Sequence, residues 1–146
     1  MTTETFIIKS LYIQNTIMLI FLGVVVSFLI HSLTKRKPKR IGVFTIWLFL
    51  VLWFFNSPFF GFSAVSVSPQ GIKLNYGILS FRNELLPVKS EWKVETSLSG
   101  IRKKKRLYFI SIAGHQSMKV KGGDKLRLLQ SIGKSIDRMK SAKQRT

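Results

Sequence analysis

The chain has 146 residues, of which 46% are hydrophobic, and its 24 Lys and Arg against 6 Asp and Glu give a formal net charge of +18. A chain that is both this apolar and this basic does not belong to the collagen-like or wholly disordered classes. Because it contains no cysteine, it can form no disulfide, thiolate nucleophile or cysteine-ligated metal site. Its apolar residues are concentrated before residue 65, which is typical of a small membrane protein.

The first long apolar segment runs over about 11–31 and contains no Asp, Glu, Lys or Arg. At about 1.5 Å per helical residue, this length covers the roughly 30 Å hydrocarbon core of a bilayer, so it predicts a transmembrane helix. No basic cluster precedes it, as one would in a cleavable signal peptide. We therefore expect the segment to be retained as an anchor.

The second uncharged segment predicts a transmembrane helix over about 41–62, with a break at Asn56-Ser57-Pro58. Proline disfavours helix at the residue before it, so the regular helix is expected to end near Phe55. The regular part alone is short for a crossing. Three phenylalanines are expected to complete the crossing or to lie in the interface: Phe59, Phe60 and Phe62.

The loop between these segments, 32–40, carries five positive charges and no negative charge: Lys35, Arg36, Lys37, Lys39 and Arg40. Short basic loops stay on the cytoplasmic side, so these residues are the topology determinants and the loop is expected to be cytoplasmic, in a bacterial inner membrane. The part beyond residue 64 is itself basic, with 18 Lys and Arg against five acids. The two signals conflict, and the side of the C-terminal domain stays open.

Beyond residue 64 the pattern changes to short alternating runs separated by turn residues, which predicts β-strands. The runs 64–68 and 72–76 flank a turn with Pro and Gly, and so predict a hairpin. Further strands are expected over 78–86, 91–98, 106–112 and 117–120.

The last part of the chain predicts an amphipathic helix over 124–141, because apolar residues recur at spacings of three and four: Leu126, Leu129, Ile132, Ile136 and Met139. Such a stripe packs on a sheet more often than on lipid, which is the alternative. The expected fold is an α+β membrane protein with a transmembrane helical hairpin over 1–64 and a basic β-rich domain over 65–146. That domain is expected to be a small antiparallel sheet or partial barrel capped by the terminal helix.

The segment 66–77, Ser-Val-Ser-Pro-Gln-Gly-Ile-Lys-Leu-Asn-Tyr-Gly, resembles the opening of the bacterial pleckstrin-homology-like (PH-like) domain that follows paired transmembrane helices. In that family a first hairpin, a strand ending in proline and a final helix recur. The segment 106–114 is loosely similar to the late strand and glycine turn of the two-helix photosystem I assembly proteins. The resemblance is architectural, covers nearly the whole chain and transfers no site residue. It implies a cytoplasmic domain, which conflicts with the orientation expected from the loop.

No recognised catalytic, cofactor-binding or metal-ligating spacing occurs. His31 is expected to be interfacial, and His115 is expected to be exposed in a hairpin turn. Gly122-Gly123-Asp124-Lys125 lacks the framework of a phosphate-binding loop and is interpreted as a turn. We therefore expect no enzymatic activity and no cofactor.

One run remains as a candidate contact site, with five successive positive charges between two predicted strands: Arg102, Lys103, Lys104, Lys105 and Arg106. At a loop tip these charges would attract anionic lipid headgroups, nucleic acid or an acidic protein surface. A solvated loop that maintains solubility is the alternative without a binding role. Membrane tethering and the lack of a nucleic-acid-reading motif argue against nucleic acid.

These observations favour a non-enzymatic integral membrane accessory or assembly subunit, which stabilises a larger complex through other integral membrane subunits. A membrane-anchored module that binds anionic lipid headgroups is the first alternative. A toxin-immunity or stress-response membrane protein is the second.

Overall fold

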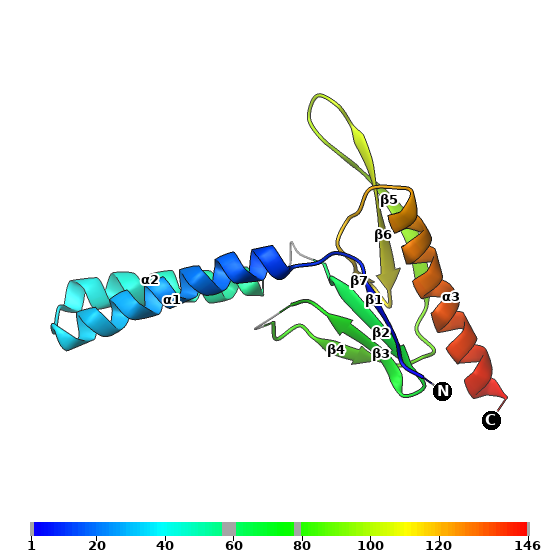
Figure 1. Cartoon of the computed structure of the whole chain (residues 1–146), viewed down its shortest axis with the longest axis horizontal. Coiled ribbons are helices and arrows are strands. Elements are labelled where there is room, and N and C mark those ends of the chain that lie inside the picture. The colour runs from blue at the N-terminus through cyan, green and yellow to red at the C-terminus, as the bar shows by residue number, and fades with distance from the viewer. Residues whose placement is uncertain (1, 57–60, 78–79, 146) are drawn as a thin grey trace. The chain divides into compact units, whose positions relative to one another are not determined.

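The computed structural model describes residues 2–56, 61–77 and 80–145, and these residues form two compact units. One unit is a hairpin of two apolar helices, α1 (Tyr12–Thr34) and α2 (Pro38–Phe55). The other, here called the β-domain, contains the strands and the C-terminal helix α3 (Asp124–Gln144) (Figure 1). Its strands are β1 (Glu4–Ile7), β2 (Ala64–Ser68), β3 (Gly71–Asn75), β4 (Glu84–Leu86), β5 (Trp92–Ser99), β6 (Lys105–Ile112) and β7 (His115–Gln116). The predicted α+β class is confirmed.

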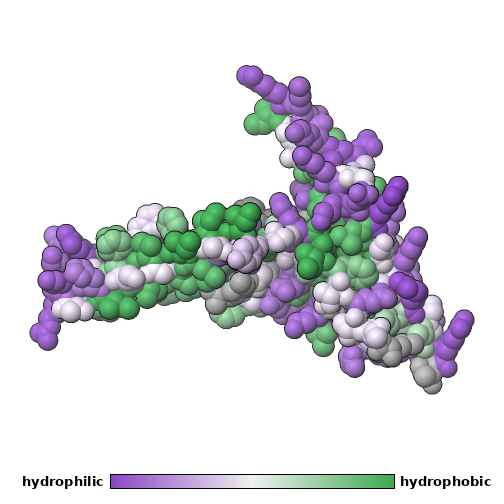
Figure 2. All heavy atoms as spheres, in the orientation of Figure 1, coloured by the Kyte–Doolittle hydropathy of each residue, from purple (hydrophilic) through white to green (hydrophobic). Residues whose placement is uncertain are grey.

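Helices α1 and α2 are joined by the short turn 35–37 and pack against each other. At about 1.5 Å per residue they measure about 35 Å and about 27 Å, and both are long and apolar enough to cross a membrane. Figure 2 shows the apolar surface that the pair exposes, with hydrophilic residues gathered at its turn. Aliphatic and aromatic side chains that cover the outside of a helix pair are those that lipid would surround.

The helix boundaries differ from the expected ones around the loop. The connection is shorter than the expected 32–40, because α1 continues to Thr34 and α2 begins at Pro38. Proline is favourable in the first helical turn, since its missing N–H would have no partner there. Helix α2 ends at Phe55, as the proline argument predicts.

The expected continuation of the second helix to residue 62 is wrong for Phe62. Its backbone is extended, because its N–H donates to the Gln116 carbonyl and its carbonyl accepts from the Met118 N–H. Its side chain is 0% exposed in the core of the β-domain. Phe59 and Phe60 lie outside the described residues.

The β-domain contains two antiparallel sheets, one in the order β1-β2-β3-β4 and one in the order β5-β6-β7. Within the described residues they do not close into a barrel. Helix α3 contacts β1, β2, β5 and β6 (Figure 1). Its Leu129, Ile132 and Ile136 are 0% exposed and join the core formed by the sheets, so the helix packs on the sheets as predicted.

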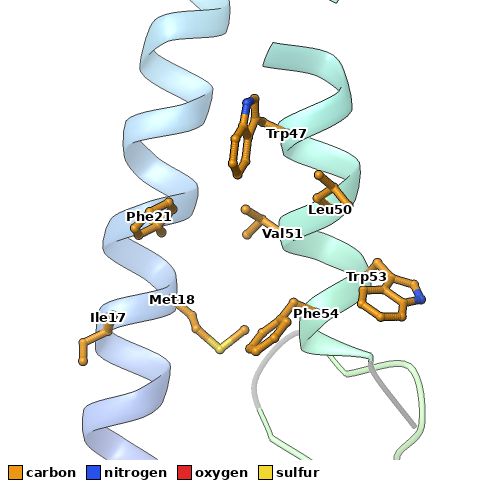
Figure 3. A pocket seen from close by; sticks show the side chains of 8 residues that line it. All are labelled: Ile17, Met18, Phe21, Trp47, Leu50, Val51, Trp53 and Phe54. Atoms are coloured by element: carbon orange, nitrogen blue, oxygen red, sulfur yellow. The ribbon is translucent and has the colours of Figure 1, made fainter. Parts of the chain in front are cut away.

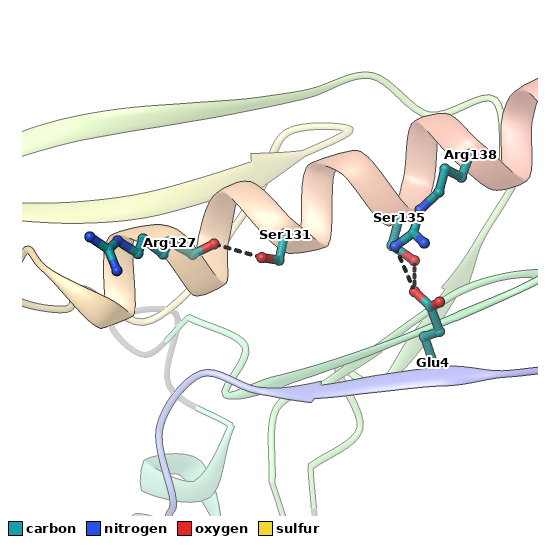
Figure 4. A network of polar contacts seen from close by, with 5 residues as sticks. All are labelled: Glu4, Arg127, Ser131, Ser135 and Arg138. Atoms are coloured by element: carbon teal, nitrogen blue, oxygen red, sulfur yellow. Dashed lines mark hydrogen bonds and ion pairs between the residues drawn. The ribbon is translucent and has the colours of Figure 1, made fainter.

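Strand β1 was not predicted. It precedes α1 but pairs with β2, which follows α2, and Ile8 directly after it is 0% exposed. At the start of β1, the Glu4 carboxylate accepts a hydrogen bond from the Ser135 hydroxyl and lies 3.4 Å from Nη2 of Arg138 on α3 (Figure 4). Residues 2–10 therefore belong to the β-domain. A strand of four residues is too short for its alternation to stand out in a sequence.

Two other elements differ from the expected ranges. The strand that pairs with β6 on its C-terminal side is β7, which is separated from β6 by a two-residue turn. The segment 117–120 forms no strand and contributes two isolated bridges, from Val120 to Tyr108 and from Ser117 to Phe62. Helix α3 runs one turn past 141, because Ala142, Lys143 and Gln144 favour helix and no glycine or proline stops it. Within 80–86, only Glu84–Leu86 forms a strand.

Candidate functional site

The five-residue basic run lies at the end of the hairpin formed by β5 and β6, here called the basic hairpin. The two strands pair in register from Trp92 opposite Ile112 to Ser99 opposite Lys105. The turn between them needs a glycine, because Gly100 has φ +115 and a side chain there would meet the Lys103 carbonyl. The long ladder and this turn project the run away from the core (Figure 1).

All five cations of the run are exposed: Arg102, Lys103, Lys104, Lys105 and Arg106. Within the part of the chain that the structure describes, none of them forms a salt bridge. The nearest acid on β5, Glu95, pairs with Lys93 instead. The tip is therefore an uncompensated positive surface, visible as the hydrophilic end of the projecting hairpin in Figure 2.

Apolar side chains accompany these charges. Ile101 is fully exposed, at 102% of its reference area, and Leu98 is 63% exposed. Sequence reasoning missed them, although Ile101 directly precedes the basic run. The tip thus presents aliphatic side chains beside its cations.

A second cluster links the two sheets. The Tyr76 hydroxyl lies 3.1 Å from Nδ1 of His115, and Nε2 of His115 lies 3.1 Å from Oε2 of Glu84. The Arg82 guanidinium lies over the Tyr76 ring, 4.4 Å from its centroid. His115 is therefore partly buried between two partners, whereas the sequence suggested an exposed turn residue.

The chemistry of this cluster favours a structural connection. Burial raises the pKa of Tyr76, the nearby Arg82 charge lowers it, and Glu84 raises it further. A tyrosine with a raised pKa remains a neutral hydrogen-bonding group near neutral pH and is a poor nucleophile. Within the described ranges, no group of three or more His, Asp or Glu residues could hold a metal ion.

The five expected topology determinants lie at the turn of the helical hairpin, and all are exposed: Lys35, Arg36, Lys37, Lys39 and Arg40. The Arg36 N–H donates to the Leu33 carbonyl and the Lys37 N–H donates to the Ser32 carbonyl, which is the pattern of a Schellman C-cap. Arg36 takes the left-handed position of this cap with φ 48, where glycine is usual. Arg36 thus occupies a position at which glycine would be less strained.

Apolar side chains line a groove of about 410 Å³ between α1 and α2. Figure 3 shows its walls, which include Phe21 on α1 and Trp47, Val51 and Phe54 on α2. The groove offers no polar group to fix a ligand. In a bilayer, acyl chains would fill it.

No protein-family model matches the chain, and neither does any curated protein or solved structure.

Proposed function

We propose that this chain is a non-enzymatic, two-pass membrane accessory subunit whose basic hairpin binds an acidic surface of a larger membrane complex. One observation carries the proposal: five exposed and uncompensated cations directly follow a fully exposed Ile101 at the end of a long hairpin. Charges alone would suffice for solubility. An isoleucine at full exposure has no such purpose, and burying it on a partner would contribute about 1.5–3 kcal/mol.

The division of roles within the tip follows from the physics of interfaces. Apolar side chains supply most of the affinity at the centre of a contact, while charges at the rim steer association and select the partner. Ile101 and Leu98 would supply the apolar centre, and the run 102–106 would supply the rim. The partner would be other integral membrane subunits that present acidic residues.

Anionic lipid headgroups are the second candidate for the same tip. An exposed aliphatic residue among cations also suits insertion into a negatively charged membrane surface, where each Lys or Arg contributes about 1 kcal/mol. The two candidates differ in what remains bound after extraction into detergent. A protein complex survives mild extraction, whereas attraction to a vesicle surface does not.

The PH-like identity of the β-domain is a proposal of the same standing. It is supported by the hairpin of β2 and β3, by β4, which ends directly before Pro87, and by the final helix α3. We further propose that α1 and α2 anchor the protein in a bacterial inner membrane with the turn 35–37 in the cytoplasm. The five cations at that turn support this orientation.

The test is extraction of the full chain in mild detergent, followed by size analysis. A subunit gives one discrete heteromeric species, and a lipid-binding module gives a small homogeneous micelle. Reversal of Lys103, Lys104 and Lys105 to Glu should leave the fold intact, because all three are exposed, and should dissociate the heteromer in a salt-dependent way.

A matched control separates the site from total charge. Reversal of three other exposed lysines of the β-domain, Lys89, Lys121 and Lys134, changes the net charge equally and should leave the heteromer intact. If both triple variants behave alike, the basic hairpin is a solubilising loop and the proposed function is wrong. A homogeneous micelle that binds anionic but not zwitterionic vesicles would favour the lipid candidate.

A further inference from the structure

A pocket of about 350 Å³ lies between α1 and α2 at the turn of the helical hairpin. It is distinct from the apolar groove described above, because its lining combines aromatic and cationic side chains. The aromatic residues are Phe28 and His31 on α1 and Phe44 on α2, and the cations are Lys39 and Arg40 on α2. Ser32, which is 2% exposed, also lines it.

The pocket is apolar on one side and cationic on the other. The rings of Phe28 and Phe44 stack with their centroids 5.4 Å apart and their planes 10° from parallel, which fixes the two helices at this level. Arg40 lies four residues before Phe44 on the same face of α2, so its backbone is about 6 Å nearer the turn. The cationic side of the pocket therefore lies one helical turn nearer the hairpin turn than the stacked phenylalanine rings.

Nothing in the helical hairpin neutralises these cations. The sequence contains no Asp or Glu from residue 5 to residue 83, and the described residues of the two helices form no salt bridge. Lys39 and Arg40 also lie in the first turn of α2, where the helix dipole disfavours positive charge. By contrast, Lys35 is the C-cap of α1, where the dipole favours positive charge, and Lys37 is the N-cap of α2.

We propose that this pocket binds an anionic phospholipid, with its headgroup phosphate on Lys39 and Arg40 and the start of an acyl chain against Phe28 and Phe44. The two cations are complementary in charge to a phosphate, and the turn of a membrane hairpin lies at the depth of the lipid headgroups. Along α2 the cations come first and the aromatic ring follows, in the same order as the phosphate and the acyl chain of a lipid. This site concerns the helices alone and is independent of the basic hairpin.

The test is native mass spectrometry of the full chain in a neutral detergent, with phosphatidylglycerol or phosphatidylcholine added as probe. The wild type should retain phosphatidylglycerol in preference to phosphatidylcholine. Changing Lys39→Gln together with Arg40→Gln should weaken phosphatidylglycerol binding by about 30-fold, which corresponds to two phosphate contacts of about 1 kcal/mol each. The matched control, Lys35→Gln with Lys37→Gln, removes the same charge beside the pocket but not in its lining, and should change binding by less than about 3-fold.

A second variant keeps both cations and fills the space. Val43 lines the pocket and is 51% exposed, so Val43→Trp should weaken lipid binding without disturbing the fold. Circular dichroism should show unchanged helix content for all variants. Glycerol phosphate, which lacks acyl chains, should not displace the lipid at equal concentration.

Equal losses in the two double variants would overturn the proposal, because the attraction would then belong to the whole turn. Unchanged binding in Val43→Trp would overturn it as well. Effective competition by glycerol phosphate would show that the pocket recognises a free phosphate and not a lipid.

Discussion

Phe6 lies opposite Val65 in the antiparallel ladder between β1 and β2, although the entire helical hairpin separates these residues in the sequence. The sheet therefore contains chain from before α1 and from after α2. Helices that span a membrane must then cross it an even number of times, because both flanking segments have to meet on one side. The pairing of β1 with β2 thus supports a two-pass hairpin by an argument that does not depend on loop charge.

Gly133 gives a test of how α3 packs on the sheet. A side chain at this position would overlap the indole ring of Trp92, whose Nε1 donates a 3.0 Å hydrogen bond to Asp137 one turn further along α3. At an open helical position, Gly→Ala stabilises by about 0.5–1 kcal/mol. Here we expect Gly133→Ala to lower the free energy of unfolding by about 1–3 kcal/mol, because the ring has to move.

Denaturant unfolding of the full chain measures this difference. Lys134→Ala, at the exposed neighbouring position, should stay within about 0.5 kcal/mol of the wild type. A stabilised Gly133→Ala variant would show that α3 does not pack closely against Trp92.

In the turn between β6 and β7, a change to glycine is expected to stabilise the protein. Ala113 has φ 50 and Gly114 has φ 84, as the two central residues of a type I′ turn require. A residue with a Cβ costs roughly 1 kcal/mol in this conformation. Ala113→Gly should therefore raise the thermal midpoint, while Gly114→Ala should lower it despite open space around the added methyl. Both changes shifting the midpoint in the same direction would be incompatible with this turn.

The raised pKa of Tyr76 predicts how the free energy of unfolding changes at alkaline pH. Burial, the largest cause, raises its pKa in the folded protein above its ordinary value, so the folded state holds the phenolic proton more tightly than the unfolded state. The stability that this contributes is complete below about pH 10 and is lost as the pH rises through the folded pKa. Tyr76→Phe should be less stable at neutral pH, since it loses a hydrogen-bond partner of His115, but should lose less stability as the pH rises above about 10. Parallel pH profiles for the variant and the wild type would refute this role.

The sequence predicted the elements whose signal is long or strongly periodic. The uncharged runs indicated α1 and α2, Pro58 indicated the end of α2 at Phe55, and the three-and-four spacing indicated the buried face of α3. It also predicted that the run 102–106 joins two strands, although Lys105 and Arg106 are the first residues of β6 and only 102–104 lie between the strands. These signals are local, so they need no knowledge of partners across the fold.

Features that depend on distant partners could not be predicted in this way. Strand β1 is stabilised by pairing with β2, and Phe62 is buried because its extended backbone bonds to Gln116 and Met118. His115 reaches Tyr76 and Glu84 only because the two sheets meet. Ala-Gly is also a weaker signal for a two-residue hairpin turn than Asn-Gly or Asp-Gly, which is why β7 was expected further along the chain.

The most direct test of the two-pass account is thiol labelling of single cysteines in intact cells, which the cysteine-free sequence permits without other changes. Thr3→Cys precedes β1, Thr34→Cys ends α1 without removing a loop charge, and Ser99→Cys lies at the end of β5. With an impermeant reagent, we predict that positions 3 and 99 label alike and that position 34 labels only after permeabilisation. Labelling at 34 with protection of both others would keep the two-pass hairpin and reverse only its orientation. Different labelling at positions 3 and 99 would contradict the account, because a strand before α1 and a domain after α2 could not then share one sheet.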